Sequence, residues 1–195
     1  MQFRIMNGFT TNEFNPIPNF DPALTGAMQT PARTASLAQL ATQIKEELGE
    51  MWLPRIYTAR ILPLRTRAFH LQLSRRQSGV QVQHTLLGVE LKIGRRRIMC
   101  PDLATARYLA AFARTGNAEV ALPYDITQIS RIADELELAW HRLLLLVEHL
   151  AAERTTAFRS RLRAQLIGEA RNEISQAGAG SSRPQFNQNT KQRRP

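Results

Sequence analysis

Residues 125–150 read DITQISRIADELELAWHRLLLLVEHL, and this stretch carries the strongest periodicity in the chain. Its apolar residues recur at alternating intervals of four and three, which is the spacing of a seam along one face of an α-helix. Asp125 stands at the N-cap position, where a carboxylate accepts a hydrogen bond from the first helical turn. The stretch therefore predicts one long helix, with a seam of Ile129, Ala133, Leu136, Trp140, Leu143, Val147 and Leu150.

The sequence does not show what the seam packs against. Three heptads pack either against the same chain or against the matching seam of a second subunit, which would give a homodimer through the long helix. The residues assigned to helix packing or oligomerisation are Ile129, Leu136, Trp140, Leu143, Val147 and Leu150.

A second apolar series follows the seam. It runs from Phe158 to Ile174 in a new phase, after a lapse at residues 153–156. Either one helix continues to about Gln176 with a slip of phase, or two helices meet near Thr155 and Thr156. Because neither Gly nor Pro separates the two series, we favour one continuous or gently kinked helix, protruding as a C-terminal arm.

The residues before the long helix favour strands. Residues 55–62 are β-branched and aromatic, and 68–73 alternate apolar with polar side chains, as strands do. Residues 80–93 alternate too, but the apolar phase changes between Val82 and Leu87, which predicts a β-bulge near 84–88. Gly94 marks a turn before a short strand at 98–100, and residues 119–122 predict another short strand.

Two further helices have recognisable ends. Ser36 and Gln39 form a capping box that opens a helix to about Met51, with Pro54 ending it. Asp102 caps a second helix over 103–114, and Gly116 follows as its stop signal. The chain is therefore predicted to be α+β, with a small antiparallel β-sheet flanked by helices, a long C-terminal helix and disordered N- and C-terminal tails.

Composition divides the chain into four expected parts. Residues 1–33 are rich in Asn, Pro and Thr and predict a mobile N-terminal arm. Residues 34–153 form the α+β core domain, 154–176 a basic helical extension and 177–195 a disordered basic tail.

Several classes of protein lack support in the sequence. Cys100 is the sole cysteine, so the chain can form neither an internal disulfide nor a cysteine-based zinc site. No apolar run is long enough for a signal peptide or a membrane span, and we expect a cytoplasmic protein of bacterial type. Because no phosphate loop, zinc-ligand cluster or nucleophile elbow is present, we predict a non-enzymatic protein with no catalytic residue, metal or cofactor.

Charge is the most informative functional signal. The chain has a formal net charge of +10, and residues 51–100 hold ten basic residues against one acidic residue. Residues 101–153 reverse this balance, with four basic and eight acidic residues. The basic residues beside predicted turns and strands, which we assign to nucleic-acid or acidic-partner binding, are Arg65, Arg67, Arg75, Arg76, Arg95, Arg96 and Arg97.

These observations lead to three hypotheses about function. The first is a nucleic-acid-binding or nucleic-acid-associated protein that uses the Arg-rich β-region, since guanidinium groups bind phosphate bidentately. The second is a protein–protein adaptor or assembly factor that docks an acidic partner, and the chain's own acidic helix is a rival for that role. The third is a small enzyme with no site visible in the sequence. Three tyrosines and one tryptophan could stack on bases: Tyr57, Tyr108, Tyr124 and Trp52. We place Tyr57 alone on a strand of the basic region, and an RNA-reading sheet needs paired aromatics on adjacent strands, so the sequence does not support that class.

Overall fold

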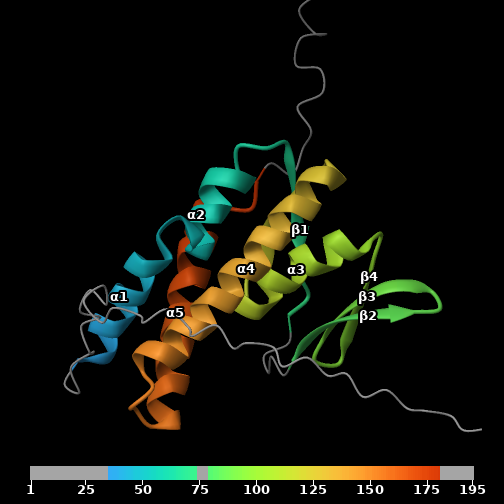
Figure 1. The fold of residues 1–195 in the computed structure, drawn as a ribbon. Helices are drawn as coiled ribbons and strands as arrows, with labels where there is room; N and C mark the ends of the chain where they lie inside the picture. Colours follow the sequence, from blue (N-terminus) through green and yellow to red (C-terminus); the bar gives the residue numbers. More distant parts are fainter. Residues whose placement is uncertain (1–34, 74–78, 181–195) are drawn as a thin grey trace, which may run out of the picture. The chain divides into compact units, whose positions relative to one another are not determined.

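The computed structural model describes residues 35–73 and 79–180 (Figure 1). The fold is α+β, as predicted, and these described residues form two small antiparallel sheets where we expected one. The expected N-terminal arm, and all but residues 177–180 of the expected C-terminal tail, lie outside the described residues. Ala177 is the last residue of a helix.

Helix α4 (Ile126–Leu150) forms where the seam predicts it. The Asp125 side chain caps it by accepting a hydrogen bond from the Thr127 amide. The first half of the seam, through Leu136, packs into a cluster with α3 and the sheets, and Trp140 lies half-buried at the edge of that cluster. The second half packs into a cluster with α1 and α5. The seam residues therefore serve as helix packing inside one chain.

The expected continuous C-terminal helix is wrong. Helix α4 ends at Leu150, and a separate helix α5 (Thr156–Ala177) begins after a short turn. Thr155 causes the new start, because its hydroxyl accepts a hydrogen bond from the Phe158 amide as an N-cap. The change of phase in the apolar series therefore marks two helices, although neither Gly nor Pro lies between them.

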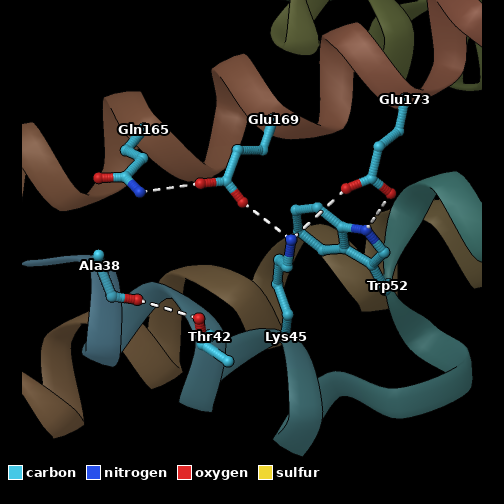
Figure 2. Close-up of polar contacts among 7 residues, drawn as sticks. All are labelled: Ala38, Thr42, Lys45, Trp52, Gln165, Glu169 and Glu173. Atoms are coloured by element: carbon cyan, nitrogen blue, oxygen red, sulfur yellow. Dashed lines mark hydrogen bonds and ion pairs between the residues drawn. The ribbon is translucent and has the colours of Figure 1, made fainter.

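Helix α5 packs into the fold and is not a protruding arm. Its buried stripe consists of Leu162, Leu166, Ala170 and Ile174. Figure 2 shows the polar contacts beside this stripe: Lys45 of α1 (Leu37–Leu48) donates to Glu169 at 2.9 Å, and Trp52 Nε1 donates to Glu173 at 2.8 Å. Lys45 also lies 3.5 Å from Glu173. These contacts connect both ends of the described chain.

Residues 53–61 are helical, so the strand expected at 55–62 is wrong. Helix α1 ends at Leu48, with Gly49 as its C-cap. A 3₁₀ turn η2 (Gly49–Met51) follows, and α2 (Leu53–Ile56) leads into a π-helical turn η3 (Tyr57–Ile61). Pro54 sits in the first turn of α2, where a missing N–H costs nothing, so it begins a helix and does not end one. Burial of Leu53, Ile56 and Ile61 in the core outweighs the preference of β-branched residues, such as these two isoleucines, for strands.

The two sheets differ in how they are connected. Strand β1 (Thr66–His70) pairs with β5 (Glu119–Pro123), which is distant in sequence. Strands β2 (Val80–Thr85), β3 (Gly88–Ile93) and β4 (Arg96–Cys100) form a meander in the order β2-β3-β4. The expected β-bulge near 84–88 is wrong, because a hairpin turn at Leu86–Leu87 changes the apolar phase.

Helix α3 (Leu103–Thr115) lies between the sheets and α4. Its predicted ends are confirmed: Asp102 accepts a hydrogen bond from the Thr105 amide, and Gly116 takes the left-handed conformation that glycine favours. Tyr108 and Phe112 of this helix pack with Tyr57 in the centre of the core. Across the described ranges, no helix is both long and apolar enough to cross a membrane.

Candidate nucleic-acid interface

Arginine side chains gather at the exposed end of the three-stranded sheet. Gly94 has a positive φ of 59° and turns the chain from β3 into β4, and its N–H donates to the Gly79 carbonyl at 3.0 Å. Arg95 lies in this turn, and Arg96 and Arg97 are the first residues of β4. All three side chains are exposed, as the sequence predicts.

The neighbours of the turn do little to offset its charge. Arg97 pairs in register with Lys92 on β3, so two cations stand opposite each other, which is unfavourable. The carboxylate of Glu90 lies 3.6 Å from Arg97, which is longer than a hydrogen bond. Its buried Oε2 has no hydrogen-bond partner in the part of the chain that the structure describes. Arg96 donates to the neutral Gln72 side chain at 3.0 Å. The turn therefore presents net positive charge to solvent.

Three acidic residues of α4, namely Asp134, Glu137 and Glu148, pair with arginines of other helices. Arg107 of α3 contacts Asp134 at 2.8 Å and Glu137 at 2.6 Å. Glu148 accepts hydrogen bonds from two arginines of α5, at 2.6 Å from Arg159 and 2.7 Å from Arg163. Helix α4 therefore satisfies these carboxylates through α3 and α5, which counts against the hypothesis that it neutralises the Arg-rich sheet within the chain.

The Arg107–Glu137 pair makes acid stability testable. The hydrogen bond from Arg107 holds the pKa of Glu137 below its ordinary value near 4.5, against the opposing effect of burial. A lowered folded pKa gives stability that is present above the unfolded value and lost as the pH falls through the folded value. We expect wild type to lose more free energy of unfolding between pH 6 and acid pH than Glu137→Gln, measured by urea denaturation. Glu135→Gln, which removes a charge two residues earlier, should follow wild type; parallel curves for wild type and Glu137→Gln would contradict the prediction.

A second group of arginines surrounds an aromatic side chain. Pairing of β1 with β5 brings Tyr124, which follows β5, beside Arg65 and Arg67. The Tyr124 N–H donates to the Arg65 carbonyl at 3.2 Å. The guanidinium carbons of Arg65 and Arg67 lie 5.2 and 5.8 Å from the centre of the Tyr124 ring, within cation–π range.

The sequence predicts Tyr124 only as an aromatic able to stack on bases, not as a part of the basic surface. It places Tyr57 on a basic strand instead, whereas the structure buries Tyr57 in η3. Tyr124 is 45% exposed and reaches the arginines through strand pairing, for which the sequence holds no local signal. Arg75 and Arg76, which we assigned to the same surface, lie outside the described residues.

Two hollows adjoin the Tyr124 ring. One, of about 470 Å³, is lined by Arg65, Tyr124 and the start of α4. The other, of about 290 Å³, is lined by Arg67, Phe69 and Tyr124, with Met99 from the far end of β4. Since Arg67 and Met99 line the same hollow, the two sheets meet at this surface.

Metal and thiol chemistry find little support at this surface. Within residues 35–73 and 79–180, His, Cys, Asp and Glu form no group of three or more that could hold a metal ion. Cys100 lines the smaller hollow, but burial raises the pKa of its thiol, which favours the unreactive protonated form. The arrangement is suited to binding an anionic, ring-bearing ligand by charge and stacking.

Comparisons of this chain with protein-family models, curated proteins and solved structures found no match.

Proposed function

We propose that this chain is a non-enzymatic nucleic-acid-binding protein whose Arg-rich β-region contacts the phosphate backbone. The contact residues in the described ranges are Arg65, Arg67, Arg95, Arg96 and Arg97. One contrast carries the proposal. In the described ranges, the helix arginines Arg107, Arg159 and Arg163 contact carboxylates at 2.6–2.8 Å, whereas the turn arginines are exposed and meet one carboxylate at 3.6 Å. Exposed, weakly neutralised guanidinium groups bind phosphate without first breaking a strong internal pair.

The proposal includes a cytoplasmic setting. A single cysteine gives the chain no internal disulfide, and this suits the reducing conditions of the bacterial cytoplasm.

Removal of the turn charges tests the proposal. We expect wild type to shift both DNA and RNA in electrophoretic mobility assays at low salt, and Arg95→Ala/Arg96→Ala/Arg97→Ala to bind more weakly. Each phosphate contact contributes about one unit to the slope of log affinity against log salt concentration, so the slope should fall by up to about three.

The control removes the same charge from the helices. Arg131, Arg142 and Arg161 are exposed on α4 and α5, so the triple alanine variant at these positions matches the loss of three charges outside the β-region. It should keep most of the affinity and the salt slope. If wild type binds no nucleic acid at low salt, or if both triple variants lose affinity equally, the proposal is wrong.

A protein–protein adaptor is the second candidate, favoured by the tip of the β2–β3 hairpin. Leu86 and Leu87 form this tip and are 106% and 83% exposed, which is unusual for two adjacent leucines. Apolar side chains at a protruding turn suit a protein partner better than a phosphate backbone. Pull-down from cell extract before and after nuclease treatment separates the candidates, because a protein partner that survives nuclease favours the adaptor.

A further inference from the structure

Tyr124 is held rigidly between two elements. Its N–H is hydrogen-bonded to the Arg65 carbonyl, and the next residue, Asp125, caps α4 through the Thr127 amide at 2.9 Å. Because the backbone is hydrogen-bonded at Tyr124 and again just after it, the Tyr124 ring leaves the surface from a defined position. An exposed aromatic ring on a rigid backbone is the element on which proteins stack bases.

The arginines beside the ring are placed to hold phosphates. Arg65 comes directly before β1 and Arg67 lies within it, and both guanidinium groups lie near the Tyr124 ring. Both are exposed, and in the absence of a ligand both lie over or beside the Tyr124 ring. A cation–π contact at an exposed site is weaker than a charge-assisted hydrogen bond to phosphate. A bound strand can therefore draw the Arg67 guanidinium away from the ring and leave that face of the ring to a base.

The two hollows that Tyr124 lines favour an unpaired base. The smaller one, of about 290 Å³, has an apolar wall that includes Phe69 and Ile126. The base faces of a duplex are covered by neighbouring base pairs, so a duplex cannot insert one base here without flipping it out. A single strand presents its bases without that cost.

Nearby carboxylates fix the side from which phosphates approach. Asp102 and Asp125 border the two hollows, and both accept hydrogen bonds from the first turns of α3 and α4 as caps. Because each cap offsets the positive end of its own helix, the attraction for an anion comes from Arg65 and Arg67. The phosphates therefore lie on the β1 side of Tyr124.

We propose that the nucleic acid bound by this chain is single-stranded, and that Tyr124 stacks on one unpaired base while Arg65 and Arg67 contact the adjacent phosphates. This inference rests on the proposed function and adds to it the form of the nucleic acid and the position of one base.

The test compares two strands with equal charge. The probes are a single-stranded oligothymidylate of twelve nucleotides and an abasic strand with the same number of phosphates, with binding measured by fluorescence anisotropy. Wild type should bind the base-containing strand roughly 5- to 150-fold more tightly, which corresponds to one stacked base. Tyr124→Ala should lose this preference and keep the affinity for the abasic strand. Tyr124→Phe, which retains the ring, should keep the preference.

Phe158→Ala is the matched control, because Phe158 also lies under a guanidinium, that of Arg154 at 5.0 Å, but on α5. It should behave as wild type. If wild type binds both strands equally, or if Tyr124→Ala retains the preference, the stacking inference is wrong while phosphate binding by the β-region stands. If neither strand binds at low salt, the inference of a single-stranded ligand is wrong, and the proposed function fails as well when the mobility assays also show no binding.

Discussion

Leu166→Ala should lower the free energy of unfolding by about 2–5 kcal/mol, the range for a large aliphatic side chain removed from a packed core. Leu166 lies on α5 and is fully buried in the cluster that α5 forms with α1 and the second half of α4. Removing its side chain leaves a cavity that two helices from opposite ends of the described chain would have to close. Urea denaturation followed by circular dichroism measures the change.

A leucine on the outer side of the neighbouring helix is the control for that experiment. Leu145 on α4 is 69% exposed, so Leu145→Ala should change the free energy of unfolding by less than about 0.5 kcal/mol. Equal small effects for both variants would mean that α5 does not pack into the core in solution. The sequence prediction of a protruding C-terminal arm would then be right.

Tyr57→Phe should lower the free energy of unfolding by about 2–4 kcal/mol, because one hydroxyl satisfies two backbone groups. The Tyr57 hydroxyl donates to the Gly178 carbonyl at 2.6 Å and accepts from the Ala121 N–H at 2.9 Å. Phenylalanine keeps the ring packing against Phe112 but leaves the buried Ala121 N–H without its partner. Thermal and urea denaturation should agree on the loss.

Tyr124→Phe removes a hydroxyl from a half-exposed tyrosine and should leave stability almost unchanged. A Tyr57→Phe variant as stable as wild type would show that water replaces the lost hydroxyl and that the link between α5 and the β1–β5 sheet is dispensable.

Features that the sequence predicts well are those with a local physical cause. The cap at Asp102 and the left-handed stop at Gly116 define α3 because each acts within one turn of helix. The prediction of the α4 seam is correct because apolar residues spaced by four and three line one face of an α-helix and do not fit a strand.

The errors arise where one local signal has two meanings. Proline can either end a helix or occupy its first turn. At Pro54 the second role holds, because Leu53 and Ile56 are buried where α2 packs against α4 and α5. The change of phase after Val82 suits either a bulge or a tight turn, and the strand register shows the turn. In the candidate site, the turn arginines could be predicted from charge, whereas Tyr124 could not, since it depends on pairing of β1 with β5.

The packing of α5 against α1 has a consequence for how the protein is made. Lys45 and Glu169 are 124 residues apart in the sequence, so at about 5–20 residues per second the ribosome adds the second roughly 6–25 s after the first. During that interval the nascent chain carries α1 without the helix that covers Leu40, Ile44 and Leu48. Exposed apolar surface of this kind invites chaperone binding or aggregation, so expression of this protein should be sensitive to chaperone supply and to synthesis that stops before α5.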